Sequence, residues 1–463
     1  VSDDAHLGHA RLWMHADLMH RWLDYEGYDV RHVENFTDVN EKIAARIGED
    51  DLGDDEASVA EHFVGDVIRD MRGLNLKRAE VYPRVSEHIP EIIDLIRTLV
   101  DRGHAYESNG SVYFDVSTFD DYGKLSNQKL EELESRATKD ERSEKRNPTD
   151  FALWKAGAVD PKTAAEHRDP ALEPLHEPCG ETWESPWGEG RPGWHIECSA
   201  MSMTHLGDTL DIHVGGRDLV FPHHENEIAQ SEAATGRQFA RYWLHVGLLQ
   251  TEGDKMSSSL GNFFTVGDAL DEFGVDVLRT FYLSTAYGSE QTYSEETIAE
   301  AEERWERLER AYEAAVDAAD SPDARTKVEA EALRDTVTET RENFRAAMND
   351  DFNVREAMAE LLGLAGAVNR HVADADEYDY RALRRAVEAF EDLGGEVFGL
   401  SFGGAGEGGD VSVAEDLVQL VLDVREAERE AGNYERADDL RDDLTALGVD
   451  VEDAPDGATF RFE

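Results

Sequence analysis

His6-Leu7-Gly8-His9 stands near the start of the chain, and Lys255-Met256-Ser257-Ser258-Ser259 lies about halfway along it. Each stretch alone is a weak signal, because two histidines around a glycine often occur by chance. Together, and with Gly261-Asn262 after the second stretch, they predict one nucleotide site. A strand-to-helix turn at Gly8 would let the backbone approach ATP phosphates, with the two imidazoles beside it. The lysine and serine stretch would close over the same phosphates and stabilise charge that develops on pyrophosphate.

The length and composition of the chain predict several folded domains. Its 463 residues, 40% of them hydrophobic, are enough for roughly two to four domain cores. The sequence contains no apolar run that could span a bilayer, and its acidic, polar start does not resemble a signal peptide. Two cysteines in this length argue against a disulfide framework and for a reducing environment, so we expect a cytoplasmic protein.

Charge is the unusual property of this sequence, with 102 acidic residues, 46 basic ones and a formal net charge of −56. The acidic residues are spread along the whole chain, which argues against a disordered acidic tail. Such a chain repels itself in dilute buffer, whereas at molar salt the Debye length falls to ~3 Å and screens most of that repulsion. The charge therefore predicts adaptation to a salt-rich cytoplasm. It says nothing about RNA binding, because such salt screens long-range attraction for any protein.

The first hundred residues alternate helical and extended patterns, which is typical of a doubly wound α/β domain. Residues 11–25 predict an amphipathic helix that ends at Gly27, and residues 29–37 predict a strand. Residues 89–101 predict a second helix, with Pro90 in its first turn. These elements, with a ligand turn at the end of a strand, indicate a Rossmann-like catalytic domain.

An insertion interrupts this domain between about residues 105 and 190. A short strand is predicted inside it at 113–116. Strand-like character then resumes at 194–203 and 209–214. The turn that follows the last strand leads into the next helix.

The rest of the chain is predicted to be mostly helical. Residues 296–316 and 330–371 carry apolar side chains at three- and four-residue spacing, as amphipathic helices do. The glycine-rich stretch 403–409 predicts a flexible linker. Beyond it, a helix or helix pair should be followed by a small hairpin of residues 449–453 and 459–462.

Cys198, His223 and Glu227 form the most specific candidate site. His223 and Glu227 are four residues apart, so on a helix they share one face. Cys198 would add a thiolate from a neighbouring strand, and the resulting set of nitrogen, sulfur and oxygen donors suits zinc. Spacing leaves two alternatives open. In one, Cys198 is a small buried apolar residue and His224-Glu225 a surface pair; in the other, His224 is the ligand in place of His223.

The two nucleotide motifs resemble the HIGH and KMSKS signatures of class I aminoacyl-tRNA synthetases, although Ser258 stands where that family usually has its second lysine. Further stretches resemble the cysteinyl-tRNA synthetases specifically, and the resemblance covers nearly the whole chain. These stretches are Asn35-Phe36-Thr37-Asp38, Arg146-Asn147-Pro148, Phe151-Ala152-Leu153-Trp154-Lys155, Arg191-Pro192-Gly193-Trp194-His195-Ile196-Glu197-Cys198-Ser199-Ala200-Met201, Asp211-Ile212-His213, Phe221-Pro222-His223-His224-Glu225-Asn226-Glu227 and Met348-Asn349-Asp350-Asp351-Phe352-Asn353.

The resemblance implies an enzyme that activates L-cysteine with ATP as the adenylate and transfers it to the 3′-end of tRNA(Cys). It also implies one zinc ion per chain, which binds the substrate thiolate, and Mg²⁺ with the ATP. Because serine is nearly isosteric with cysteine, a pocket rejects it poorly by shape. A bond between zinc and sulfur would make the distinction chemically, without an editing domain. We expect a monomer that does not associate with membranes.

By the same resemblance, Cys198, His223 and Glu227 are the zinc ligands. The family has one further ligand, a cysteine in a Cys-Gly-x-Thr stretch just before the His-x-Gly-His motif. Because the chain begins at Val1, we expect it to be truncated at the N-terminus by a misassigned start site. Cys179, in the insertion, is an alternative fourth ligand.

The resemblance also assigns the nucleotide contacts. His6, Gly8 and His9 would contact the phosphates, and Lys255 would meet the pyrophosphate. Ser258 would donate only a neutral hydrogen bond where lysine supplies charge. This substitution would weaken transition-state stabilisation unless Lys255 or Mg²⁺ compensates for it.

Two further groups of binding residues follow from the resemblance. Thr37 would hold the amino group of the substrate, and Trp194 would wall the cysteine pocket. Gly215, Gly216 and Asp218 would form the adenosine-binding turn, with Asp218 on the ribose hydroxyls.

The tail resembles the anticodon-binding domain of the family. Arginine and aspartate side chains there would read the edges of unstacked anticodon bases. Without the family, the same stretch is an ordinary charged helix. The residues assigned to this role are Arg429, Asp438, Arg441 and Asp453.

The predicted domain order begins with a catalytic domain and ends with the tail. Its segments are 1–104 (catalytic, first half), 105–190 (insertion), 191–250 (catalytic, second half), 251–295 (KMSKS-type loop and stem-contact region), 296–402 (tRNA-binding helical bundle), 403–411 (linker) and 412–463 (anticodon-binding tail).

Two other functions compete with this assignment. A cysteine ligase could use the same adenylate on an amino-sugar acceptor, but relatives of that kind lack the anticodon-binding tail. A non-catalytic paralogue that binds tRNA or cysteine would fit Ser258 and the missing first cysteine. The intact His-x-Gly-His stretch argues against it.

Overall fold

The computed structural model divides the chain into two compact units, Val1–Leu400 and Ser401–Glu463, and each is described by itself. No helix in the described part of the chain is long and apolar enough to cross a membrane. The described residues are 2–49, 52–128, 144–170, 172–251, 254–255, 265–404, 418, 421–422, 425, 436–437, 440–441, 444, 449–454 and 457–462, with the backbone alone at 254–255, 404 and 449–462.

Helix α1 (Leu7–Tyr25) confirms the helix predicted at 11–25 and extends it to the His-x-Gly-His stretch. The Nδ1 atom of His6 accepts a hydrogen bond from Gly8 N at 3.0 Å, and His6 N donates one to His9 Nδ1 at 3.2 Å. This reciprocal cap pairs two backbone N–H groups at the start of the helix. Both imidazoles are therefore held at the first turn.

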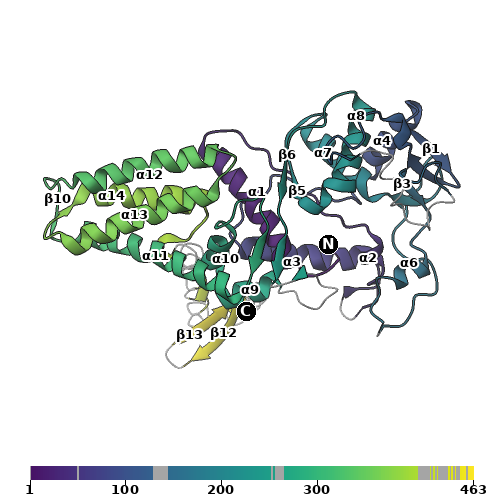
Figure 1. Cartoon of the computed structure of the whole chain (residues 1–463). Helices are drawn as coiled ribbons and strands as arrows, with labels where there is room; N and C mark the ends of the chain where they lie inside the picture. The colour runs from purple at the N-terminus through teal and green to yellow at the C-terminus, as the bar shows by residue number, and fades with distance from the viewer. Residues whose placement is uncertain are drawn as a thin grey trace. The chain divides into compact units, whose positions relative to one another are not determined.

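Strands β5 (Leu210–Gly216) and β6 (Ala240–Val246) run parallel. Parallel neighbours need a crossover, and helix α8 (Glu225–Thr235) supplies it. The start of α1 reaches the carboxyl end of this pair, because Arg11 Nε donates to Gly247 O at 2.8 Å. Ligands of α/β domains bind outside the carboxyl ends of parallel strands. The unit is drawn in Figure 1, where α1 crosses its middle.

Two predicted strands are wrong. Residues 29–37 are extended but form only isolated bridges, from Val33 to Val81 and from Phe36 to Arg84, instead of a regular ladder. Residues 194–203 are helical and belong to α7 (Trp194–Leu206). This helix contacts α4, α8, β3 and β5. Because it is covered on several sides, its sequence lacks the one-sided apolar pattern that identifies a surface helix.

The insertion contains a four-stranded sheet with the order β1-β2-β3-β4, antiparallel throughout. Its second strand confirms the strand predicted near 113 but ends at Phe114, before the predicted end at 116. Helix α4 (Ile89–Asp101), as predicted, has Pro90 in its first turn and packs against β1 and α7. The strands are β1 (Ala105–Ser108), β2 (Ser111–Phe114), β3 (Phe151–Ala156) and β4 (Gly190–Pro192).

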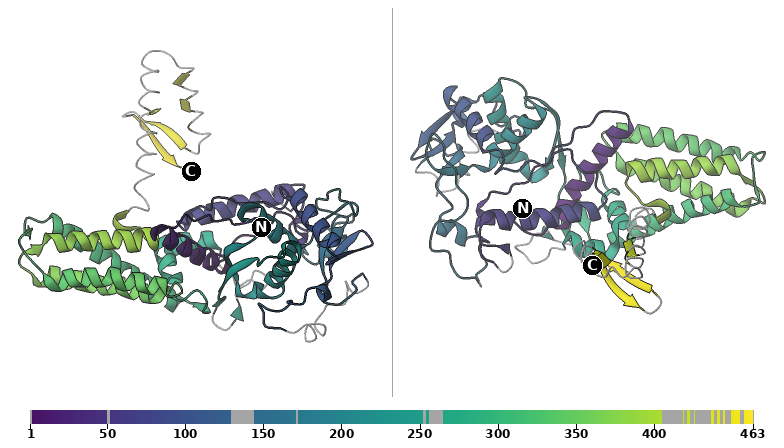
Figure 2. Two further views of the ribbon diagram at one scale, coloured as in Figure 1. Left: turned by 90° about the horizontal axis from the view of Figure 1, so that it is seen from above. Right: turned by 180° about the vertical axis from the view of Figure 1, so that it is seen from behind.

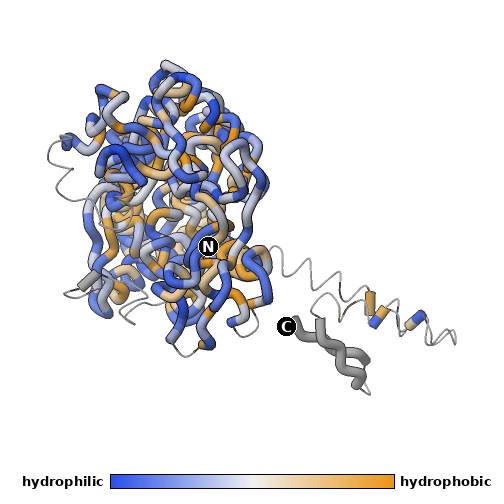
Figure 3. The backbone as a smooth tube through the Cα atoms, turned by 90° about the vertical axis from the view of Figure 1, so that its right-hand side faces the viewer, coloured by the Kyte–Doolittle hydropathy of each residue, from blue (hydrophilic) through white to orange (hydrophobic). Residues whose placement is uncertain are grey.

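The helices predicted after residue 294 form a bundle whose members lie side by side in both views of Figure 2. Figure 3 shows hydrophilic and hydrophobic stretches alternating along the tube on the face of the first unit that is turned to the viewer. The apolar pattern of 330–371 spans two helices, because Asp351 and Phe352 adopt positive φ angles of 55° and 52° and turn the chain. The bundle helices are α11 (Glu295–Asp320), α12 (Glu331–Asn349), α13 (Val354–Asp374) and α14 (Tyr380–Ala389).

A small three-stranded sheet links the catalytic part to the bundle. Its strand β7 pairs antiparallel with β8 and parallel with β9. The elements here are β7 (Leu249–Thr251), β8 (Asp254–Lys255), α9 (Val266–Phe273), α10 (Val275–Tyr282) and β9 (Gln291–Tyr293).

Further α-helices and strands of the first unit lie outside the groups above. They are α2 (Glu41–Ala44), α3 (Glu56–Gly73), α6 (Pro161–Ala165), β10 (Ala324–Arg325) and β11 (Tyr378–Asp379).

The second unit contains the predicted hairpin. Strands β12 (Val449–Ala454) and β13 (Gly457–Phe462) pair antiparallel, which confirms the strands expected at 449–453 and 459–462. Most of the glycine-rich stretch 403–409 lies outside the described residues.

Replacement of Gly193 by alanine should destabilise the protein by about 1–3 kcal/mol, because overpacking of a tight site has that cost. Gly193 precedes α7, and an added Cβ would lie 2.0 Å from the carbonyl oxygen of Ala152 in β3. Gly65→Ala in α3 is the matched control, since a Cβ there meets nothing within 4 Å. That change should stabilise by about 0.5–1 kcal/mol through helix propensity. Urea unfolding in molar KCl measures both, and equal effects would contradict the expectation.

Candidate active site

The structure brings Cys198, His223 and Glu227 together. One ligand atom of each residue lies within 4.8 Å of the others. His223 precedes α8 and Glu227 lies in its first turn, so the four-residue spacing places His223 Nε2 2.8 Å from Glu227 Oε1. Cys198 comes from α7, a helix, instead of the strand that the sequence predicts.

A second set of ligand atoms shares the same carboxylate. His213, His224 and Glu227 also place one ligand atom each within 4.8 Å of one another. His213 Nε2 lies 2.6 Å from Glu227 Oε2, and His224 Nδ1 lies 2.9 Å from His245 Nε2. The alternative in which His224 takes the place of His223 therefore has a geometric basis.

The electrostatics of the cluster follow from its burial. Burial would raise the pKa of Glu227, but the rings of His213 and His223 hold it well below its ordinary value. Burial raises the pKa of the Cys198 thiol well above its ordinary value, and the charge of Glu227 adds to this effect. Burial lowers the pKa of His224 to about 3. A neutral imidazole is the form that binds a metal.

A cleft of about 650 Å³ adjoins this cluster, and Thr37, Trp194 and His195 are among the residues that line it. His195 connects the two, because its Nδ1 lies 2.9 Å from Nδ1 of His223. Trp194 stacks on His195 with the ring centroids 5.4 Å apart and remains 49% exposed. The two residues predicted to bind the substrate thus share one cavity beside the candidate metal ligands.

The nucleotide residues gather at the carboxyl end of β5 and β6. The rings of His6 and His9 stack 3.9 Å apart. Gly216 ends β5 opposite Val246. A Cβ on Gly215 would lie 2.4 Å from the ring of His224. The predicted adenosine turn therefore directly adjoins the histidine cluster.

Beyond the lysine and serine stretch, the described chain resumes at Thr265, beside the start of α1. Thr265 forms an antiparallel bridge with His6, and Val266 N donates to Ala5 O at 2.9 Å. At the near end, Lys255 lies opposite Gln250 in the pairing of β8 with β7. Lys255 is thus paired with β7, and the residues at which the described chain resumes are paired with the start of α1, which carries His6.

The remaining predicted residues are located as follows. Asp218 is exposed in the turn after β5, and Arg441 is exposed in the second unit. Lys255 and Asp453 lie in β8 and β12, where only the backbone is described. Ser258, Arg429 and Asp438 lie outside the described residues. Cys179 is in the insertion, with its sulfur 3.7 Å from Ala44 O, and belongs to neither ligand set.

Sequence reasoning missed an aromatic wall behind the cluster. Trp243 and His245 are two residues apart on β6, so they share one face of the strand. Trp243 stacks on His213 with the centroids 4.4 Å apart. The alternation of Trp243 and His245 was a signal that could have identified them. His213 and His195 stand in the quoted stretches but received no role.

Family models match three parts of the chain. The model described as tRNA synthetases class I (C) catalytic domain matches residues 1–303. The DALR domain matches residues 343–403, and the cysteinyl-tRNA ligase anticodon binding domain matches residues 416–461.

Curated relatives align with the whole chain. The cysteine–tRNA ligase of Haloarcula marismortui is 68% identical and aligns with 100% of this chain and 94% of its own length. The cysteine–tRNA ligase of Halobacterium salinarum is 64% identical, with coverage of 100% and 93%. That of Thermococcus onnurineus is 44% identical, with coverage of 100% and 92%.

Solved structures show the same fold. Methionyl-tRNA synthetase of Mycobacterium tuberculosis in complex with methionyl-adenylate aligns with a TM-score of 0.62 and 17% identity, over 86% of this chain and 89% of that chain. LeuRS of Agrobacterium radiobacter K84, in a ternary complex with tRNA, aligns with a TM-score of 0.59 and 12% identity, over 86% and 82%. At these identities the likeness concerns the fold alone.

Proposed function

This chain belongs to the cysteine–tRNA ligase family, and from that premise we propose that it selects cysteine with a zinc ion held by Cys198, His223 and Glu227. As a member of the family it joins cysteine to tRNA with consumption of ATP. The zinc proposal rests on one observation, the convergence of a thiol, an imidazole and a carboxylate within 4.8 Å. These donors fit zinc, because its sites combine sulfur, nitrogen and oxygen ligands.

The zinc ion would supply a Lewis acid that binds the substrate thiolate and not the hydroxyl of serine. His213 would support it indirectly, since its contact of 2.6 Å orients the carboxylate of Glu227. Trp194 would cover the substrate from the cleft side, and Thr37 would accept a hydrogen bond from its amino group. The contacts of Trp194 and His195 with His223 support these assignments, because both residues line the cleft.

Catalysis would depend on positioning and electrostatics, without a protein nucleophile. A carboxylate oxygen of cysteine attacks the α-phosphorus of ATP, and the bond to the pyrophosphate oxygen breaks. His6 and His9 would contact the phosphates, and Lys255 would neutralise charge on the departing pyrophosphate. A hydroxyl at the 3′-end of the tRNA then attacks the carbonyl carbon, and AMP leaves.

The cleft would also admit the 3′-end of the tRNA. Lys42, Lys145 and Lys155 line it, together with His167. Cationic side chains in a cavity of a chain with net charge −56 suit a phosphate backbone. Lys155 is partly neutralised by Glu41, whose Oε1 lies 3.3 Å from its Nζ.

The charge of the chain supports activity at molar salt, where the repulsion among its acidic residues is screened. We propose that the enzyme acts as a monomer in a salt-rich cytoplasm, with Mg²⁺ bound to the ATP. The sedimentation coefficient in molar KCl tests the oligomeric state.

Transfer of labelled cysteine to tRNA(Cys) in molar KCl should be observed, together with cysteine-dependent exchange of pyrophosphate into ATP. A zinc chelator should abolish both reactions, and added zinc should restore them, because the ligand set is proposed to bind the substrate through the ion. Exchange without transfer to tRNA would favour the ligase that uses an amino-sugar acceptor. Absence of both reactions would favour a binding protein without catalysis.

A further inference from the structure

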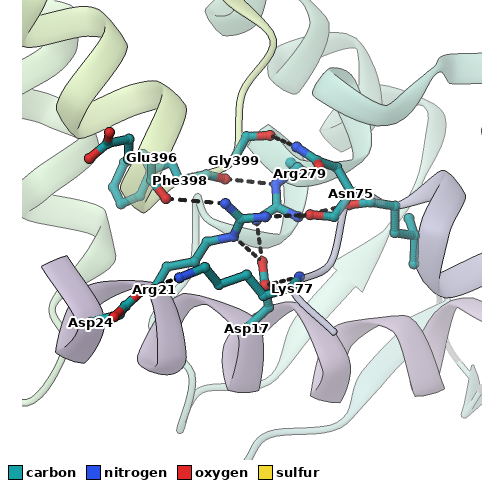
Figure 4. A network of polar contacts seen from close by, with 10 residues as sticks. Asp17, Arg21, Asp24, Asn75, Lys77, Arg279, Glu396, Phe398 and Gly399 are labelled. Carbon is teal, nitrogen blue, oxygen red and sulfur yellow. Dashed lines mark hydrogen bonds and ion pairs between the residues drawn. The ribbon is translucent and has the colours of Figure 1, made fainter. Parts of the chain in front are cut away.

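Arg279 on α10 is completely buried and makes hydrogen bonds to three separate segments (Figure 4). Its Nη2 donates to Asp17 Oδ2 at 2.6 Å, its Nη1 to Leu74 O at 2.7 Å, and its Nε to Phe398 O at 2.7 Å. A planar guanidinium can serve three such acceptors at once, whereas an ammonium cannot hold this geometry. Arg279 is therefore a junction between α1, the segment after α3 and the end of the bundle.

The carboxylate of Asp17 is held by further donors. Arg21 Nε donates to Oδ2 at 2.8 Å, and Lys77 N donates to Oδ1 at 2.7 Å. Burial would raise the pKa of Asp17, but Arg279 and Arg21 hold it below its ordinary value. The buried charges of this junction are thus paired, which is the condition for a stable buried ion pair.

The last residues of the first unit are bound to this junction through their backbone carbonyls. Asn75 Nδ2 donates to Gly399 O at 2.9 Å, and Arg21 Nη1 donates to Glu396 O at 3.2 Å. Gly399 has a φ of 68°, and a Cβ there would lie 2.5 Å from Cζ of Arg279. The guanidinium and this glycine are thus fitted closely to each other.

The three segments have different functions in the proposed reaction. Asp17 is on α1, whose first turn carries His6 and His9. Arg279 is on the helix that follows α9, where the chain leaves the lysine and serine stretch. Residues 396–399 lead to Leu400, where the first unit ends, and residues 416–461 match the anticodon-binding model.

We propose that Arg279 is a positioning residue for the tRNA-dependent step, because it fixes the point at which the chain leaves the first unit toward the anticodon-binding tail. The proposal rests on the proposed function. Adenylate formation needs only cysteine and ATP, so it does not depend on where the tail begins. Aminoacylation needs tRNA bound correctly in the active site while its anticodon is held by the tail. Loss of the hydrogen bonds of Arg279 should therefore slow aminoacylation and leave the rate of adenylate formation nearly unchanged.

The test compares Arg279→Lys and Asn75→Gly with the wild-type chain in molar KCl. Arg279→Lys keeps a charge for Asp17 but cannot reach all three acceptors. Asn75→Gly removes only the bond to Gly399 and tolerates the φ of 54° at this position. The readouts are pyrophosphate exchange without tRNA, and kcat and KM for tRNA in aminoacylation. A matched control is Arg345→Lys in α12. Arg345 is exposed, and its Nη2 lies 2.7 Å from Oε2 of Glu26, which follows the end of α1.

In Arg279→Lys, we expect kcat/KM for tRNA to fall about 10- to 100-fold, because small displacements of bound groups cost that much. The exchange rate should change by less than about 3-fold, and Asn75→Gly should show the same split with a smaller effect, since one hydrogen bond is lost. Arg345→Lys should change neither rate.

A purely structural role would lower both reactions together, in proportion to lost stability, and that result would overturn the proposal. An unchanged kcat/KM for tRNA in both variants would also overturn it. If Arg279→Lys fails to fold, the result of Asn75→Gly decides alone. Failure of the wild-type chain to charge tRNA would instead overturn the proposed function, and this inference with it.

Discussion

Cys198→Ser should lose its zinc, and its cysteine-dependent pyrophosphate exchange should fall by more than ~100-fold. Even the loss of a residue that only hydrogen-bonds to a metal ligand lowers metal affinity or activity about 10- to 100-fold. A serine hydroxyl is a poor zinc ligand, because it does not ionise at neutral pH as a thiol near a metal does. His223 and Glu227 would remain, within 4.8 Å of the substituted position. Two protein ligands hold zinc far less tightly than three. Zinc per chain, measured by mass spectrometry of the metal, and the exchange rate check this expectation.

The chain offers a matched control, because its other cysteine lies in the insertion and in neither ligand set. Cys179→Ser should retain both zinc and activity.

His224→Ala distinguishes the two ligand sets of the site. If His213, His224 and Glu227 hold the metal, His224→Ala will lose zinc and Cys198→Ser will keep it, and the proposed ligands are then wrong.

Lys255→Ala should slow adenylate formation about 10²- to 10³-fold, the usual cost of removing one group that stabilises charge in the transition state. Ser258 stands where the family usually has a second lysine, so Lys255 is the cation of this stretch. It lies opposite Gln250 in a paired strand, and beyond the stretch Thr265 bridges to His6. The measurement is the single-turnover rate of adenylate formation with saturating cysteine and ATP.

The zinc content of Lys255→Ala should equal that of the wild-type chain, which separates a phosphate effect from damage to the metal site. Lys327→Ala is a suitable control, because this lysine is exposed in the bundle and its loss changes the net charge equally. An adenylation rate that does not respond to Lys255→Ala would show that the stretch does not act on pyrophosphate. Equal losses in both variants would indicate a general charge effect.

Local patterns in the sequence determined a large part of this protein. The four-residue spacing of His223 and Glu227 places both on one side of a helix start, because the period of the helix is fixed by its backbone. The boundaries of α4 followed from Pro90 and the apolar period, since these act within a few residues. The bundle and the final hairpin followed in the same way. In each case the controlling interactions are short-range, so neighbouring residues suffice to predict them.

The tertiary structure alone decided which distant segments meet. Residues 194–203 form a helix that is enclosed on several sides, and enclosure removes the one-sided apolar pattern that sequence reasoning needs. Residues 29–37 form no regular strand, although their pattern is extended. His213 and His245 joined the site only through the pairing of β5 with β6. Contacts of this kind depend on how whole surfaces pack, which periodicity does not encode.

The sequence by itself determined the family motifs, the candidate ligand types and the strongly acidic charge, because each is a property of residue identity and short spacing. Only the fold decided that Cys198 approaches His223 and Glu227 from a helix. It alone decided that Arg279 reaches Asp17, 262 positions earlier in the chain. Such pairs form because burial of a charge requires a partner, wherever in the sequence that partner stands.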